Sequence, residues 1–334
     1  MTLPENTPLP LPEEVIPQPA QAVTLRRSRQ AIRRAAKPWW LLISILMYVV
    51  GLASGYSLWG AQKTGEKAAL SGSDAYTALL EQINPKAGYT LPIDFGNLGT
   101  QLVEAGVINR DLFIQVYQKA GQPLTDEQLA ILDGTFTGQM AMNGTNAYFL
   151  LNFLWATGLA SQNPILDSGP IQKSGQNGIE GFASTGGWTL ATHPIREIFS
   201  KSQLFVLTAD QQKRLEEVAV VVYRPCCDNP TIFPDCNHGM AMLGLLEVMA
   251  SQDASKEEML EAAKYVNAFW YPQQTLEQAV YFQNTEGLTY QDVDAGLLLG
   301  RQYSSGSGFQ QLHQFLETNG LLPQAPSSGG SCGV

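Results

Sequence analysis

The chain of 334 residues is long enough for one large or two modest domains with a real core. Apolar residues make up 44% and charged residues 15%, which excludes both disorder throughout and a polytopic membrane protein. The formal net charge of −10 argues against nucleic-acid binding, which needs a basic surface.

Residues 1–37 differ in composition from the rest of the chain. The first 20 residues hold six prolines and no periodic apolar pattern, which predicts a disordered cytoplasmic tail. The basic run AVTLRRSRQAIRRAAK follows at 22–37. It is either an interfacial helix against anionic lipid headgroups or simply a determinant of membrane topology.

Residues 38–60 predict a single transmembrane anchor. No Asp, Glu, Lys, Arg or His interrupts this stretch, and about 20 apolar residues suffice to cross a bilayer core. Tryptophan and tyrosine flank both ends, and the basic cluster before it orients the amino terminus to the cytoplasm. Two alternatives are a signal peptide cleaved near Gly51-Leu52-Ala53 and a buried core helix.

Beyond the anchor, apolar residues recur at helical spacing and predict a mainly α extracytoplasmic domain over residues 65–320. Thr125 and Ser73 are candidate helix caps, and residues 146–160, apolar nearly all round, should form a central buried helix. The expected helices are 73–83, 97–106, 110–121, 125–134, 146–160, 208–225, 236–252, 255–271, 275–283 and 309–320.

Two segments lack this helical pattern. Residues 161–195 are rich in Gly, Ser and Pro and predict a long irregular stretch, with room for a few short strands. Residues 321–334 predict a flexible Gly/Ser tail that carries Cys332. A long connection inside a compact domain is typical of functional or mobile segments.

Three of the four cysteines fall in one short segment, RPCCDNPTIFPDCNHGM, together with one of the three histidines. Cys226, Cys227, Cys236 and His238 are therefore the candidate metal ligands, because thiolate and imidazole select zinc, copper, iron or an iron–sulfur cluster. We expect Asp235 or Asn237 to cap the next helix, which would place Cys236 and His238 in its first turn.

Three interpretations of this cluster stay open. The first is one metal ion or cluster on three cysteines and a histidine, including copper on Cys236, His238 and Met242. The second is a disulfide between Cys236 and Cys226 or Cys227, structural or exchanging, with Cys332 as a mobile partner. The third is unlinked buried cysteines beside core methionines, and packing is the more common role for Met240 and Met242.

The blocks PCCDNPTIFPDCNHGMAMLGLLEVMASQ, LPIDFGNLGTQLVEAGV, NFLWATGLASQNPIL and FASTGGWTL resemble those of a family of membrane-anchored bacterial proteins with no established activity. They cover most of residues 91–270. The resemblance implies the topology described above and no particular chemistry.

The segment is also weakly similar to CDGSH-type iron–sulfur domains. Cys227 and Cys236 have the eight-residue gap of that pattern, and Pro234 falls at its proline position. The sequence departs from the pattern because Cys226 and Cys227 are adjacent and Asn237 replaces the aspartate after the last cysteine. The histidine also comes two residues after that cysteine instead of four. The similarity therefore does not imply an iron–sulfur cluster of the CDGSH type in this protein.

Other candidate residues are isolated. His193 either approaches the cysteines as a further ligand or is a plain loop residue, and His313 lies on an amphipathic helix. Ser184 and Thr185 precede two glycines, but no base accompanies them, and no phosphate-binding or hydrolase motif occurs.

Two functional hypotheses follow from the sequence. The first is an envelope protein whose Cys/His site handles a soft or borderline metal or exchanges thiols and disulfides. The second is a non-enzymatic envelope scaffold with structural disulfides and an acidic surface for a protein partner. Neither hypothesis specifies an oligomeric state, and neither involves nucleic acid.

Overall fold

The structure is a computed structural model that describes residues 73–174 and 178–323. The chain divides into residues 1–66 and residues 67–334, and every described residue belongs to the second unit. The predicted cytoplasmic segment, the predicted anchor at 38–60 and Cys332 lie outside the described residues. Among the described residues, no helix combines the length and apolar character needed to cross a bilayer.

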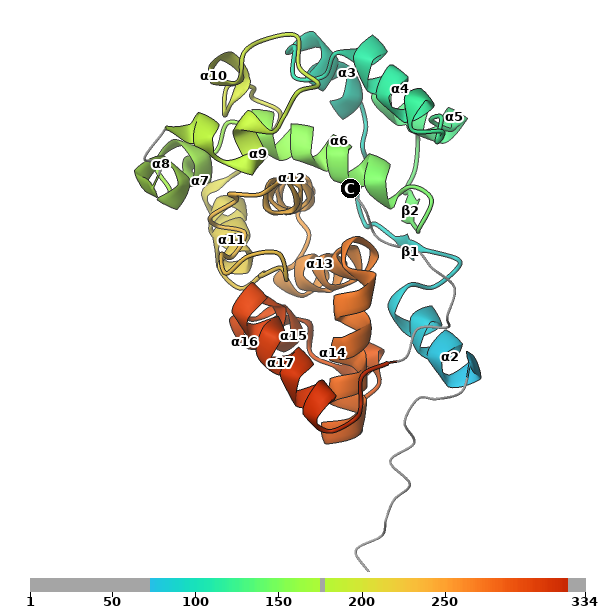
Figure 1. Cartoon of the computed structure of the whole chain (residues 1–334). Helices are drawn as coiled ribbons and strands as arrows, with labels where there is room; N and C mark the ends of the chain where they lie inside the picture. Colours follow the sequence, from blue (N-terminus) through green and yellow to red (C-terminus); the bar gives the residue numbers. More distant parts are fainter. Residues whose placement is uncertain (1–72, 175–177, 324–334) are drawn as a thin grey trace, which may run out of the picture. The chain divides into compact units, whose positions relative to one another are not determined.

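The described chain is mainly helical, as the periodicity predicted (Figure 1). Its helices are α2 (Ser73–Ile83), α3 (Leu98–Glu104), α4 (Arg110–Lys119), α5 (Asp126–Leu132), α6 (Ala147–Ala160), α7 (Pro164–Asp167), α8 (Pro170–Ser174), η2 (Ile179–Gly181), α9 (Ala183–Gly186), α10 (Ile195–Ile198), α11 (Ala209–Ala219), α12 (Asn237–Ser251), α13 (Lys256–Trp270), α14 (Pro272–Thr285), η3 (Tyr290–Asp292), α15 (Ala295–Leu299), α16 (Arg301–Ser304) and α17 (Gly306–Thr318).

Side-chain caps set the starts of several of these helices. The Thr125 hydroxyl oxygen accepts a hydrogen bond from the Gln128 amide, and the Thr125 amide donates one to Gln128 Oε1, which completes the capping box expected at α5. Ser255 and Glu258 form the same arrangement at α13. These reciprocal bonds satisfy amides that the first turn of a helix leaves without a partner.

Strand structure in the described residues is limited to one short antiparallel pair. Strands β1 (Tyr89–Thr90) and β2 (Ala141–Met142) pair Tyr89 with Met142, and a single bridge joins Ser161 to Ser202. Residues 161–195 hold no named strand in their described part, and they contain the short helices α7, α8, η2 and α9, with α10 beginning at Ile195. Helices of four or five residues are too short to show an apolar period, so this stretch read as irregular.

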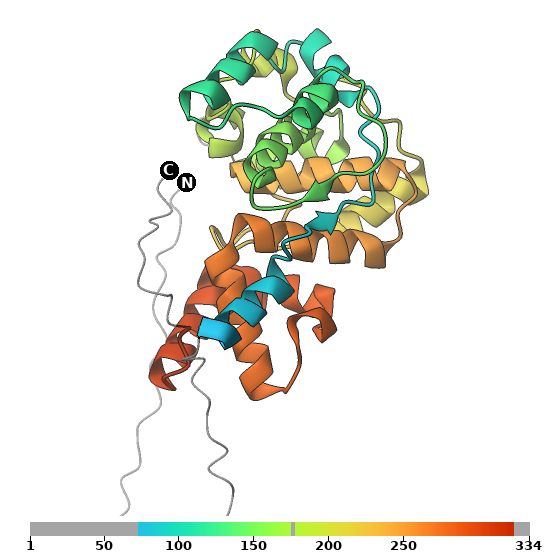
Figure 2. The same ribbon diagram turned by 90° about the vertical axis from the view of Figure 1, so that its right-hand side faces the viewer.

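The core is organised around α6 and α12, which lie side by side in Figures 1 and 2. Nearly every side chain of α6 is buried, as predicted for residues 146–160. At their crossing, a Cβ on Gly158 would lie 2.2 Å from the Met240 carbonyl oxygen, and one on Gly244 would lie 2.2 Å from the Leu154 carbonyl oxygen. Glycine at both positions therefore lets the two backbones touch.

Helix α13 lies between two apolar clusters. Val266 and Phe269 belong to the main core around α6 and α12, whereas Tyr265 and Ala268 belong to a second cluster. That second cluster is built from α2 and the C-terminal helices, which lie together in both ribbon views. The connection between α11 and α12, residues 220–236, carries three of the four cysteines.

A carboxyl group is buried in the main core. Glu247 lies in α12 with its side chain fully enclosed, and neither carboxylate oxygen has a hydrogen-bond partner among the described residues. Burial raises the pKa of Glu247 well above its usual range, and the nearby Ser161 and Asn163 side chains oppose this only in part. The folded protein therefore retains this proton at a pH where the unfolded chain has released it.

We expect the substitution Glu247→Gln to stabilise the protein, and increasingly so as the pH rises from 5 to 8. In the unfolded chain the Glu247 side chain loses its proton near pH 4.3. Above that pH, the buried Glu247 lowers the free energy of unfolding of the wild type by at most about 1.4 kcal/mol per pH unit, until the pH reaches the pKa of the folded state. Urea denaturation at both pH values measures this difference. The exposed Glu257→Gln is the control and should show no such trend. An equal gain at pH 5 and pH 8 would contradict the prediction.

Candidate metal centre

The cysteine loop, residues 224–236, ends where α12 begins. Cys236 is itself the cap of α12, and its Sγ accepts a hydrogen bond from the Gly239 amide at 3.3 Å. The expectation that Asp235 or Asn237 caps this helix is therefore wrong, because the carboxylate of Asp235 is bound elsewhere. His238 does lie in the first turn, as predicted, whereas Cys236 stands just before it.

A buried arginine holds the loop together. Arg224 is 1% exposed, and its Nε donates to Cys236 Sγ at 3.0 Å. Nη1 donates to the carbonyl of Asn229 at 2.8 Å, and Nη2 donates to Asp235 Oδ1 at 2.8 Å and to the Phe233 carbonyl at 3.2 Å. One guanidinium thus connects the middle of the loop to both of its final residues.

Gly239 makes room for this guanidinium. A Cβ at position 239 would lie 2.4 Å from Arg224 Nη2 and 2.7 Å from Nε. Any side chain there would displace the arginine from the start of α12. The Asp235 carboxylate is fixed from its other side by Asn229 Nδ2, which donates to Oδ2 at 2.8 Å.

The loop brings three of the four predicted ligands together. The Sγ atoms of Cys226, Cys227 and Cys236 all lie within 4.8 Å of one another. Cys226 Sγ lies 3.5 Å from Cys236 Sγ and 3.8 Å from Cys227 Sγ. A disulfide needs about 2.05 Å, so the three thiols are unlinked and the predicted Cys236 disulfide is not found.

The three thiols titrate as a group. Hydrogen bonds from Cys226 and Cys227 lower the pKa of Cys236, and the Arg224 guanidinium lowers it further. Hydrogen bonding to Cys226 and Cys236 raises the pKa of Cys227. Cys236 is therefore the thiolate of the set, and its neighbours are proton donors to it.

The fourth predicted ligand, His238, stands beside the sulfurs without joining their group. No His238 atom belongs to the set of ligand atoms within 4.8 Å of one another. Its Nδ1 lies 3.0 Å from Asn237 Oδ1, and its ring packs against Trp270 and Tyr271, with centroids 5.6 and 4.7 Å away. Burial lowers the pKa of His238 to about 4, so the imidazole is neutral at pH 7.

Tyr271 adds a hydrogen bond from outside the loop. It stands between α13 and α14, and its hydroxyl donates to Cys226 Sγ at 3.0 Å. The loop also contacts the start of α17, because the Gly306 amide donates to the Cys227 carbonyl at 2.9 Å and the Ser307 amide donates to Asp228 Oδ1 at 2.8 Å. The sulfurs thus lie where α12, α14 and α17 meet.

The other predicted residues do not join the centre. His193 lies 3.9 Å from Glu197, and its ring packs on Gly106, whereas His313 bonds Glu277 at 2.7 Å. Met240 and Met242 are buried in the main core, which confirms packing as their role. Neither histidine belongs to a metal-ligand group among the described residues.

Ser184 is buried at the start of the short helix α9. Its amide donates to the Asp235 carbonyl at 3.1 Å, and its carbonyl accepts from Trp155 Nε1 at 2.7 Å. Its hydroxyl is buried and has no hydrogen-bond partner in the part of the chain that the structure describes.

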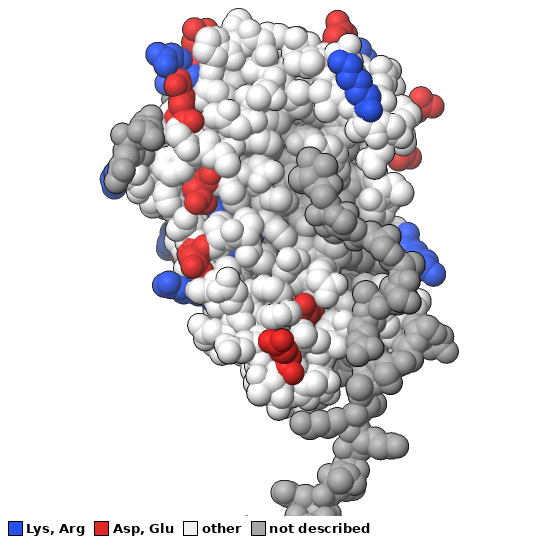
Figure 3. Space-filling model, viewed as in Figure 1, with Lys and Arg blue, Asp and Glu red and all other residues white. Residues whose placement is uncertain are grey.

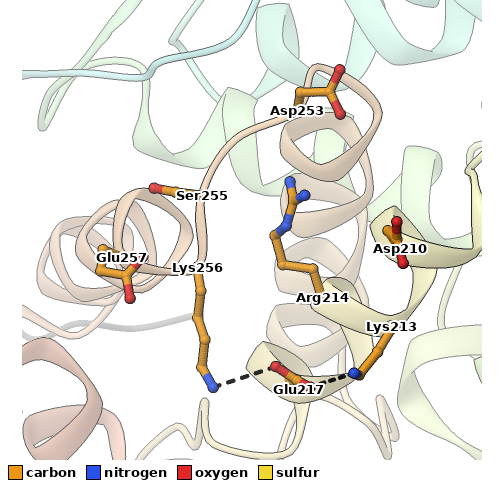
Figure 4. Close-up of a pocket in the computed structure, with 8 residues that line it drawn as sticks. All are labelled: Asp210, Lys213, Arg214, Glu217, Asp253, Ser255, Lys256 and Glu257. Carbon is orange, nitrogen blue, oxygen red and sulfur yellow. Dashed lines mark ion pairs between the residues drawn. The ribbon is translucent and has the colours of Figure 1, made fainter.

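Charged side chains line a cleft between α11 and α13 (Figure 4). Glu217 lies between Lys213, at 3.9 Å, and Lys256, at 3.6 Å. Arg214 donates to the Ala254 carbonyl at 2.6 Å. The lining holds four carboxylates and three cations, so neither sign of charge dominates the cleft. On the face drawn in Figure 3, charged side chains are likewise few and scattered.

Sequence reasoning missed Arg224, Tyr271 and Gly239. Arg224 is the one charged residue in VAVVVYRPCC, and a lone basic residue between an apolar run and two cysteines was the available signal. Tyr271 lies 44 residues after Cys227 and gave no signal at all. Comparison with protein-family models, curated proteins and solved structures finds no match.

Proposed function

We propose that this protein binds a soft or borderline metal ion through Cys226, Cys227 and Cys236, on a domain held outside the cytoplasmic membrane by residues 38–60. The observation that carries the proposal is the convergence of three sulfurs within 4.8 Å. Two thiolates on one ion at about 2.3 Å lie about 3.8 Å apart at a tetrahedral angle. The separations of 3.5 and 3.8 Å already match that value.

The surroundings of the sulfurs support a metal centre. The Arg224 guanidinium and the Gly239 amide both donate to Cys236, and Tyr271 donates to Cys226. Such donors orient ligands and balance the negative charge that accumulates on several thiolates around one ion. Without an ion, two of the three thiols stay protonated, so loading a metal releases protons.

The proposal is tested on the full-length chain, purified anaerobically without a histidine tag. We expect about one equivalent of copper, zinc or iron by elemental analysis. Cys236→Ser and Cys227→Ser should each lose it while far-UV circular dichroism shows that the helices persist. The Cys332→Ser variant provides the same substitution outside the loop. A wild-type protein that holds no metal, both as purified and after anaerobic loading with each ion, would refute the proposal.

A thiol–disulfide centre is the second candidate, and the 3.5 Å separation of Cys226 and Cys236 favours it. Oxidised glutathione would accept two electrons from these thiols, forming the Cys226–Cys236 bond and two molecules of reduced glutathione. Mass spectrometry should then find this bond in Cys227→Ser but not in Cys226→Ser. If glutathione leaves all thiols free in the metal-free protein, this candidate is excluded.

A further inference from the structure

We propose that the centre selects a monovalent soft ion, Cu(I), held by three thiolates and no fourth ligand. This inference rests on the proposed metal-binding function and specifies the ion and its coordination. Structural zinc sites take four ligands, whereas Cu(I) is a closed-shell ion that soft thiolates bind in low coordination numbers. The number of available donors therefore separates the two ions.

The described residues supply three donor atoms, and the polar groups beside them are already hydrogen-bonded to other partners. The group of converging ligand atoms holds sulfur only. A carboxylate oxygen close to the sulfurs, Asp235 Oδ1, lies 3.9 Å from Cys227 Sγ, but it accepts from Arg224 while Oδ2 accepts from Asn229. Moving Asp235 onto a metal would leave the buried guanidinium without its carboxylate, which is strongly unfavourable.

His238 is also held away from the sulfurs. Its ring lies against Tyr271, whose hydroxyl is already bonded to Cys226 Sγ, and against Trp270. To become a ligand, the imidazole would have to leave both aromatic rings and its contact with Asn237. Trp270 and Tyr271 thus keep His238 out of the coordination shell, which consists of three sulfurs.

The charge around the sulfurs suits a monovalent ion. Three thiolates around Cu(I) carry a net charge of −2, against −1 for the same thiolates around Zn(II). Cys236 Sγ faces the Arg224 cation at 3.0 Å and the amino terminus of α12, and Tyr271 donates to Cys226 at 3.0 Å. These donors stabilise the additional negative charge.

The spacing of the sulfurs is also close to a trigonal site. Three sulfurs at about 2.3 Å from one ion in a plane lie about 4.0 Å apart. The observed separations of 3.5 and 3.8 Å, and the limit of 4.8 Å, need only small side-chain shifts. Cys226 is exposed, so an incoming ion can reach the three sulfurs from solvent.

The test uses X-ray absorption spectroscopy on the full-length protein, loaded anaerobically with Cu(I) in one sample and Zn(II) in another. We expect three sulfur neighbours and no nitrogen around copper, and an added oxygen or nitrogen neighbour around any bound zinc. His238→Gln should keep the three sulfurs, with Cu(I) affinity within a factor of two of wild type. Affinity is measured by competition with bathocuproine disulfonate.

Substitution of Tyr271 tests the hydrogen bond to Cys226. Tyr271→Phe should weaken Cu(I) binding about tenfold, whereas Tyr265→Phe, a tyrosine in α13 that stacks on Tyr89, should not change it. A fourth sulfur lost in Cys332→Ser, a nitrogen neighbour lost in His238→Gln, or binding of zinc alone would overturn the inference and leave the metal-binding proposal standing. Failure to bind Cu(I) would overturn the inference, and failure to bind copper, zinc and iron alike would refute both.

Discussion

Replacing Arg224 with methionine should lower the free energy of unfolding by about 3–5 kcal/mol, since removing one partner of a buried ion pair leaves the other charge without compensation. Methionine fills similar space, but it cannot donate to Asp235, to the Asn229 and Phe233 carbonyls or to Cys236. The loop would then lose the contacts that bring its two ends together. Chemical denaturation of the wild-type and variant proteins at pH 7 measures the loss.

Arg110→Met is the matched control. Arg110 makes the same kind of pair with Asp133, through Nε at 2.7 Å and Nη2 at 2.8 Å, but both side chains are about 40% exposed. An exposed pair contributes at most about 1 kcal/mol, so the two variants should differ severalfold. Equal losses in the two variants would show that burial of Arg224 is not what holds the loop. Arg224→Lys keeps the charge but loses the planar set of guanidinium donors. Its loss of unfolding free energy should therefore lie between those of Arg224→Met and Arg110→Met.

The same guanidinium explains why part of the site was beyond sequence reasoning. Composition and spacing singled out the three cysteines, because thiolates within eleven residues can meet around one ion in many different loop conformations. Which residue caps α12 depended instead on where Asp235 points, and Arg224 determines that. The packing of the arginine against Gly239 is a tertiary contact, and no local propensity reports it.

Some helices of the fold could likewise be predicted from the sequence, and others could not. The long helices were predictable because their own residues carry the signals: an apolar surface all round in α6, and reciprocal caps at α5 and α13. Helices α15 and α16 were missed because, at five and four residues, they are too short for apolar residues to repeat at helical spacing. The predicted anchor and residues 324–334, which include Cys332, lie outside the described residues and stay predictions. The first residue of the predicted flexible tail, Leu321, is instead buried in the second apolar cluster.

The placement of the centre depends on a contact far from the sulfurs. Helix α12 carries Cys236 at its start and crosses α6 at Gly244, so the crossing positions one ligand relative to the rest of the domain. Tyr271, just before α14, and the start of α17 contact the loop from the C-terminal helices. A shift of α12 would therefore separate Cys236 from Cys226 while leaving the loop's own sequence intact.

Gly244→Ala should consequently destabilise the protein by about 1–3 kcal/mol and weaken metal binding as well, although alanine is the better helix former. The new Cβ would lie 2.2 Å from the Leu154 carbonyl oxygen and 2.7 Å from the Gly158 amide nitrogen, so the helices must separate. Gly296→Ala, in α15, is the helical control; its Cβ would meet no atom closer than 3.3 Å, and its effect should stay below about 1 kcal/mol.

A double variant distinguishes a forced separation of the helices from independent local strain. Gly158 and Gly244 face each other, so once Gly244→Ala has moved α12 away, Gly158→Ala should add little. The double variant should therefore lose at least about 0.5 kcal/mol less than the two single losses added together. Strict additivity, measured by urea denaturation of all four proteins, would mean that each alanine is accommodated separately and that the crossing does not position Cys236.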